Sequence, residues 1–201
     1  NEFLGDKWFF DEITNRDPRL YDNIDTVSLR LKGVEGLWAI GGYAGDRFVN
    51  ESVRFSAEGL SNTNATDAPV MKLNEVMLNY LEASAELADL GAYTLTQNDL
   101  DITINKLRNR ESVDMPTVTL SGNHFAVNGV NVNDPSRDID VSPILWEIRR
   151  ERRIELVYEG LRFNDLRRWS KLEYADMVLT PKINMGAWVD KPRFVNWYNT
   201  T

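Results

Sequence analysis

The clearest hydrophobic periodicity in the chain lies between residues 73 and 88, where apolar side chains recur every three or four positions. This spacing predicts one long α-helix, and Gly91 provides a residue suited to its C-terminal cap. The side chains expected to form the inward face of this helix are Leu73, Val76, Met77, Tyr80, Leu81, Leu87 and Ala88.

A second periodic stretch follows after a short linker. Thr96 or Asn98 can cap its first turn, and the pattern ends near Arg110. Because the linker is short, the two predicted helices are expected to pack antiparallel. The resulting hairpin is similar to a tetratricopeptide pair, and one such pair cannot bury both of its faces without neighbours. The inward residues expected in the second helix are Leu100, Ile104 and Leu107.

A long charged helix is predicted to begin at Ser142 and Pro143, because serine is a favoured N-cap and proline is favoured at the first helical position. The segment continues through a run of arginines and glutamates, with a break expected near Gly160 and a further helical turn or more to Trp169. Apolar residues surround the charges nearly all the way round. We therefore expect protein to contact this helix on more than one side and to bury some of its ion pairs.

The charged side chains of this segment are spaced so that both signs lie side by side. Four glutamates fall four residues apart in one row, and three glutamate–arginine pairs fall three residues apart, within reach of each other on a helix. We expect a structural ion-pair network that fixes the helix against its neighbours. Its expected members are Glu147, Arg150, Glu151, Arg152, Glu155, Glu159 and Arg162, paired as 147/150, 152/155 and 159/162.

The rest of the chain predicts loops and short strands. Residues 1–66 form an irregular segment of loops and short strands, with a turn expected at Asp17-Pro18. Residues 67–201 form the helical portion, and the whole is expected to be one compact unit. Within it, short β-like runs flank an Asn128-Gly129 pair, which predicts a hairpin.

Composition excludes several classes of function. The formal net charge of −8 argues against a nucleic-acid surface, because phosphate binding needs an excess of Lys and Arg. The absence of cysteine excludes disulfides, thiolate metal sites and thiol nucleophiles. With a single histidine, His124, a zinc site or a usual catalytic triad is nearly excluded, so no metal and no cofactor are expected.

The glutamate row raises one enzymatic alternative, a glycoside hydrolase, which needs two carboxyl groups across a sugar-sized cleft. Carboxylates on one helix point the same way, however, and each has an arginine within one turn that keeps it ionised. The chain is therefore expected not to be an enzyme. Oxygen-rich side chains also gather in the loop at residues 131–140, where turn formation is favoured over calcium binding because the EF-hand spacing is missing.

Aromatic residues in the predicted loops are the best candidates for ligand binding. Tryptophan and tyrosine rings stack on the apolar face of a sugar, while short polar and arginine side chains bond its hydroxyls. A tryptophan is, however, more often part of the core than of a ligand site. The residues that fit a ligand site are Trp8, Trp38, Tyr43, Asp46 and Arg47.

Three segments together resemble a known family. Residues 147–156 (EIRRERRIEL) with 159–169 (EGLRFNDLRRW) are similar to the C-terminal signature of the SusD/RagB family. Residues 71–87 (MKLNEVMLNYLEASAEL) are similar to a family helix, and residues 104–110 (INKLRNR) to the end of another. The segments occur in the family's order. The resemblance is strong from Met71 to Trp169 and weak before residue 66.

The resemblance implies a mainly α protein that is the C-terminal portion of a SusD-like fold, with a tetratricopeptide-like hairpin, a long charged helix, extensive loops and short β-hairpins. The family consists of outer-membrane lipoproteins of Bacteroidetes that capture nutrients, mostly glycans. The resemblance implies that the protein binds oligosaccharides for polysaccharide utilization and is not a catalyst. It also implies that the protein acts as a lid over a SusC-like TonB-dependent outer-membrane transporter. The implied location is the cell surface, through a lipid on an upstream cysteine that belongs to a further N-terminal part. A peptide- or protein-binding helical-repeat module is the alternative.

Overall fold

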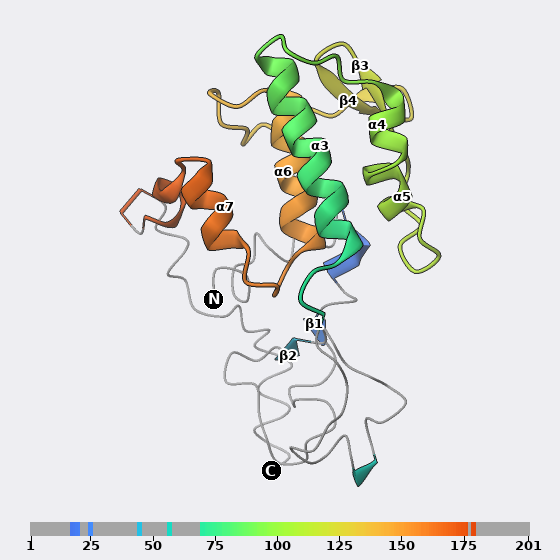
Figure 1. Ribbon diagram of the computed structural model, residues 1–201, viewed down its shortest axis with the longest axis vertical. Coiled ribbons are helices and arrows are strands. Elements are labelled where there is room, and N and C mark those ends of the chain that lie inside the picture. The colour runs from blue at the N-terminus through green and yellow to red at the C-terminus, as the bar shows by residue number, and fades with distance from the viewer. Residues whose placement is uncertain are drawn as a thin grey trace, which may run out of the picture. The chain divides into compact units, whose positions relative to one another are not determined.

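The computed structural model describes residues 17–20, 24–25, 44–45, 56–57, 69–176 and 178–179. The chain divides into two compact units, residues 69–159 and residues 1–68 with 160–201. Helices dominate the described residues and the strands are short, which confirms the mainly α fold class (Figure 1). No helix among these residues is both long and apolar enough to cross a bilayer.

Helix α3, Leu73–Asp89, packs alongside helix α6, Pro143–Glu155, in the 69–159 unit (Figure 1). The predicted inward face of α3 is wrong at most of its positions. Leu73 is 65% exposed and Leu87 is 45% exposed, and Val76 and Tyr80 also face outward. Helix α3 can bury polar side chains because ion pairs with α6 compensate for their loss of hydration. A prediction from hydrophobicity places such polar positions on the exposed face. The buried residues of α3 are Leu78, Leu81, Glu82, Ser84 and Ala85.

The second predicted helix is present as two short helices, α4 (Gln97–Asp101) and α5 (Ile104–Arg108), which run back beside α3 (Figure 1). Thr96 is the N-cap, as predicted, and forms a capping box with Asp99. The break at Ile102 and Thr103 was not predicted. The Thr103 hydroxyl donates to the carbonyl oxygens of Asp99 and Leu100, and such local bonds compete with a continuous helix.

A three-stranded antiparallel sheet follows, with β3 (Val118–Ser121), β4 (His124–Val127) and β5 (Val130–Asn131) in chain order. Val127 pairs with Val130, so Asn128 and Gly129 form a two-residue turn in which both residues have positive φ, as the predicted hairpin requires. The Asn105 side chain accepts from the Val118 amide at 2.7 Å and donates to its carbonyl at 2.9 Å. These bonds join β3 to α5.

Helix α6 begins as predicted, because Pro143 is its first residue and the Ser142 hydroxyl accepts from the Leu145 amide at 3.3 Å. Its end differs from the prediction. The helix stops at Glu155, so Glu159 does not extend the glutamate row along it. Tyr158 adopts φ of +64° and Gly160 φ of +74°, left-handed conformations that cannot continue a right-handed helix.

The other unit contains a short 3-10 turn, η1 (Pro18–Leu20), where the turn was predicted, and the antiparallel strands β1 (Ile24–Asp25) and β2 (Ala44–Gly45). It also contains α7 (Arg162–Arg168) and the 3-10 turn η2 (Leu172–Ala175). After the break at Gly160, α7 provides the further helical segment expected before Trp169. The guanidinium groups of Arg162 and Arg168 lie 5.4 and 5.0 Å from the centroid of the Trp169 ring.

Candidate functional site

A buried set of charges joins α3 to α6. Glu82 of α3 is almost fully buried, and its carboxylate oxygens lie 3.6 Å from Arg149 Nε and 3.9 Å from Arg152 Nε. The Arg152 guanidinium also donates to Asn79 Oδ1 at 2.6 Å. Two arginines one turn apart on α6 therefore face one carboxylate of α3, and this explains why α3 turns a polar residue inward.

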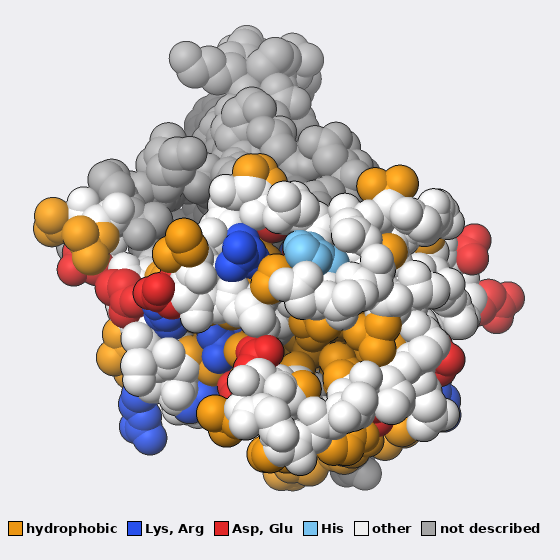
Figure 2. All heavy atoms as spheres, turned by 90° about the horizontal axis from the view of Figure 1, so that it is seen from above, with side chains coloured by type: hydrophobic (Ala, Val, Ile, Leu, Met, Phe, Trp, Pro, Cys, Tyr) orange, Lys and Arg blue, Asp and Glu red, His pale blue; other side chains and the backbone are white. Residues whose placement is uncertain are grey.

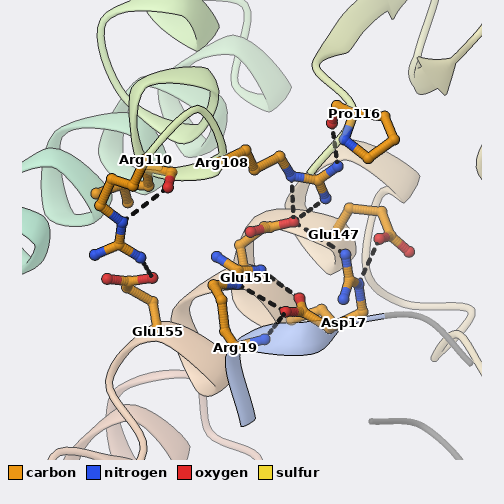
Figure 3. Close-up of polar contacts among 10 residues, drawn as sticks. Asp17, Arg19, Arg108, Arg110, Pro116, Glu147, Glu151 and Glu155 are labelled. Atoms are coloured by element: carbon orange, nitrogen blue, oxygen red, sulfur yellow. Dashed lines mark hydrogen bonds and ion pairs between the residues drawn. The ribbon is translucent and has the colours of Figure 1, made fainter. Parts of the chain in front are cut away.

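Glu151 is the centre of a second group. Its Oε1 accepts from Arg108 Nε at 3.0 Å and from Arg150 Nη2 at 3.0 Å, and it is also bonded by Arg108 Nη2 (Figure 3). Arg108 Nη1 donates to the carbonyl of Pro116 at 3.0 Å. The expected pair of Glu147 with Arg150 is present, with Nε 2.8 Å from Oε2. This group ties α6 to α5 and to the segment before β3.

Glu155 and Glu159 have partners outside α6. Glu155 Oε2 lies 2.7 Å from Arg110 Nη2 (Figure 3). Its Oε1 accepts from Asn74 Nδ2 at 2.9 Å. Glu159 Oε1 lies 3.2 Å from Lys72 Nζ. The partners expected for these two glutamates were Arg152 and Arg162. The observed partners are distant in sequence and could not be found from helical spacing.

The three sequence segments that carry the family resemblance meet through these contacts to the charged residues of α6. Glu82 lies in residues 71–87, Arg108 and Arg110 lie in residues 104–110, and the α6 residues belong to the third segment. The presence of charged residues in all three segments is the sequence feature from which these ion-pair partners could have been predicted. Reasoning from one helix at a time missed it.

The comparisons with known proteins address the family directly. The sequence model of the SusD family matches residues 31–199, which is most of the chain. The chain belongs to the SusD family. No curated protein matches it closely enough to be counted as a relative.

A crystal structure of a SusD-like carbohydrate binding protein from Bacteroides fragilis is similar to this SusD-family chain, with a TM-score of 0.50 and 27% sequence identity. The similarity covers 79% of this chain and 29% of that protein. The chain therefore spans less than a third of the length of the structure that it matches.

The five residues expected to bind ligand, Trp8, Trp38, Tyr43, Asp46 and Arg47, lie outside the residues that the structure describes. Within the described ranges, no group of three or more His, Asp or Glu side chains is placed to hold a metal ion. His124 lies at the start of β4, where it pairs with Ser121 across the hairpin. In the loop at residues 131–140, Asp134 and Asp138 each accept from a backbone amide two residues on, as turn-forming aspartates do.

Asp99 binds the side chains of three other residues in a compact cluster that was not predicted from the sequence. The members of this Asp99 cluster are Asp99, Tyr80, Tyr93 and Thr96. Asp99 Oδ1 accepts from the hydroxyls of Tyr80 at 2.6 Å and Tyr93 at 3.0 Å, and its Oδ2 accepts from the amide and hydroxyl of Thr96 at 2.8 and 2.7 Å. Burial favours a higher pKa for Asp99, but the bonds from Tyr80, Thr96 and Tyr93 prevail and lower the pKa. Bonding to Tyr80 and Asp99 raises the pKa of the Tyr93 phenol.

Asp99→Asn is expected to lower the free energy of unfolding by about 1–3 kcal/mol at neutral pH, because an amide group would replace an oxygen that accepts hydrogen bonds. The folded-state pKa of Asp99 lies below the unfolded value, so the carboxylate stabilises the fold fully above about pH 4. This stabilisation is lost as the pH falls below that point. Urea unfolding at a series of pH values should show the difference in free energy of unfolding between wild type and Asp99→Asn shrinking in acid. If the difference in free energy of unfolding between wild type and Asp99→Asn stayed constant with pH, the lowered pKa of Asp99 would be contradicted.

Proposed function

We propose that this SusD-family chain takes part in the non-catalytic binding of an oligosaccharide for nutrient uptake. The observation that carries the proposal is the similarity, at 27% identity, to a solved protein described as a SusD-like carbohydrate binding protein. Membership in the SusD family over residues 31–199 supports the same function. The net charge of −8 is compatible with a neutral sugar, because hydroxyl groups need donors and acceptors and no net charge.

The sugar is proposed to bind at Trp8, Trp38, Tyr43, Asp46 and Arg47. The rings of this set would stack on the apolar C–H face of a pyranose, and the aspartate and arginine would bond its hydroxyls. The same functional groups recur in small-molecule sites that combine apolar contact area with a few oriented polar atoms.

The arrangement of the glutamates supports a binding role in preference to hydrolysis. Glu147, Glu151 and Glu155 lie on one face of one helix, and each is nearly fully buried with an arginine within bonding distance. A glycosidase needs two carboxyl groups on opposite sides of an accessible sugar. Carboxylates that are buried against guanidinium groups cannot reach a glycosidic bond.

The place of action that we propose is the outer membrane, at the cell surface, with attachment through a lipid on a cysteine of a further N-terminal part. The proposed partner is a SusC-like TonB-dependent transporter that receives the oligosaccharide. Family membership supports both proposals. Co-purification of the full-length protein with a transporter from detergent-solubilised outer membranes tests them, and recovery only in the periplasmic fraction would contradict them.

Trp38→Ala is expected to abolish oligosaccharide binding and to leave the melting temperature almost unchanged, because a ring that serves as a sugar platform contributes little to the core. Isothermal titration calorimetry with a panel of neutral oligosaccharides measures the first effect, and thermal unfolding the second. Trp188→Ala, which changes a tryptophan outside the proposed set, is the control. A large drop in melting temperature for Trp38→Ala would place that ring in the core, and binding of peptides in place of sugars would favour a peptide-binding function.

A further inference from the structure

We propose that the outer edge of strand β3 is a latent pairing surface for β3 of a second copy of this chain. Two side-chain amides, those of Gln97 in α4 and Asn105 in α5, occupy this edge and keep the second copy away. The sheet is ordered β3–β4–β5, so among the described residues no strand lies on the other side of β3. The backbone N–H and C=O groups of such an edge can bond to a strand of another molecule.

The two amides bond the outward backbone groups of β3 as a neighbouring strand would. The Val118 N–H donates to Asn105 Oδ1 at 2.7 Å, and the Leu120 N–H donates to Gln97 Oε1 at 2.9 Å. The Val118 carbonyl accepts from Asn105 Nδ2 at 2.9 Å and from Gln97 Nε2 at 3.0 Å. Alternate residues of an antiparallel strand bond to the same neighbour, so these groups of Val118 and Leu120 face away from β4. Side chains therefore close this edge.

Asp101 fixes the orientation of both amides. Its Oδ1 accepts from Gln97 Nε2 at 2.9 Å and from Asn105 Nδ2 at 2.7 Å. An ionised carboxylate only accepts hydrogen bonds, so it attracts the nitrogen of each amide and leaves the amide oxygen to accept from β3. The three side chains therefore act as one group that is directed at the backbone of β3.

The strand itself lacks the protection that edge strands usually have. Such strands are commonly very short or carry lysine or proline. Strand β5, on the opposite edge, has only two residues, whereas β3 has four and contains neither lysine nor proline. Residues 115–133 contain no Asp, Glu, Lys or Arg. Figure 2 looks onto the end of the molecule where β3 and β4 lie, and its right-hand part shows mostly uncharged side chains and backbone (white and orange).

The same sequence indicates a second copy as the partner. A charged strand that pairs with its own copy places like charges opposite each other, which is destabilising. The β3 sequence, VTLS, carries no charge, and valine and threonine favour strands. Antiparallel pairing about a two-fold axis brings the same outward groups of both copies together. Strand β3 is therefore complementary to itself once its edge is open.

The double variant Gln97→Ala with Asn105→Ala removes both amides, and alanine is compatible with both helices. Its dissociation constant for self-association, measured by sedimentation equilibrium of the whole chain, is expected to be at least tenfold lower than that of the wild type. The reason is that the outward groups of β3 lose their side-chain partners and can bond to a second strand. Asn98→Ala removes an exposed amide from the same helix α4 and should leave the dissociation constant unchanged.

Adding Thr119→Lys to the double variant is expected to reverse the gain in self-association. Thr119 is exposed on β3, and two paired copies would bring the added lysines together. Circular dichroism checks that each variant is folded. If the double variant is unfolded, Gln97→Ala alone, which changes a half-buried side chain, should show the same direction of effect. A folded variant that self-associates no more than the wild type, or whose self-association survives Thr119→Lys, would overturn the proposal. None of these outcomes depends on whether the chain binds a sugar.

Discussion

Glu151→Ala is expected to lower the free energy of unfolding by about 3–5 kcal/mol, because it leaves the buried Arg108 guanidinium without its carboxylate. Glu151 and Arg108 are both almost fully buried, and the same carboxylate oxygen also accepts from Arg150 at 3.0 Å. Removing the anion strands positive charge in a region from which water is excluded. Urea unfolding at neutral pH, followed by circular dichroism, measures the loss.

Two further variants separate burial from pairing. Glu86→Ala removes a carboxylate that is 45% exposed and lies 3.4 Å from Arg149, so it should cost no more than about 1 kcal/mol. The double variant Glu151→Leu with Arg108→Met removes both charges and fills the space with apolar atoms, and it should recover much of the loss. If Glu151→Ala proved as mild as Glu86→Ala, the pair would be accessible to solvent, contrary to the structure.

Leu78→Ala is expected to lower the free energy of unfolding by about 2–5 kcal/mol, because the side chain is fully buried and the substitution leaves a cavity on the inner side of α3. Leu73→Ala, on the same helix, should change it by no more than about 0.5 kcal/mol because Leu73 is largely exposed. The two variants make the same chemical change, so the contrast reports which face of α3 packs. The hydrophobic pattern of the sequence predicts the reverse order, with Leu73 inside. Thermal or urea unfolding of both variants decides between the two.

Local chemistry allowed the starts of helices and the turns to be predicted. Ser142 with Pro143, Thr96 with Asp99, and Asn128 with Gly129 each form structure through residues that are close in sequence. The positions at which helices end were harder to predict. Thr103 interrupts the second helix with a side-chain bond to carbonyl groups three and four residues before it, and threonine often occurs inside helices without doing so.

The buried face of α3 could not be predicted from hydrophobicity, because its stabilisation depends on residues far along the chain. Glu82 is inside only because Arg149 and Arg152 are there to meet it. That α6 bears a buried ion-pair network was predicted, and the partners on α3 and α5 were not. The proposed sugar-binding residues, of which Trp38 is the most directly testable, lie outside the described residues and stay a prediction from the sequence.

The bonds that join α3 to α6 have a consequence for the order of folding. The side chains of Arg149 and Glu86 are 63 residues apart in sequence, those of Arg152 and Asn79 are 73 apart, and those of Asn74 and Glu155 are 81 apart. Each such contact requires closure of a long loop, whose entropic cost precedes any gain from the contact. The helices α4 and α5 and the β3–β4–β5 hairpins, whose contacts are local, can form before that closure. The charged contacts between α3 and α6 therefore lower mainly the unfolding rate and have less effect on the folding rate.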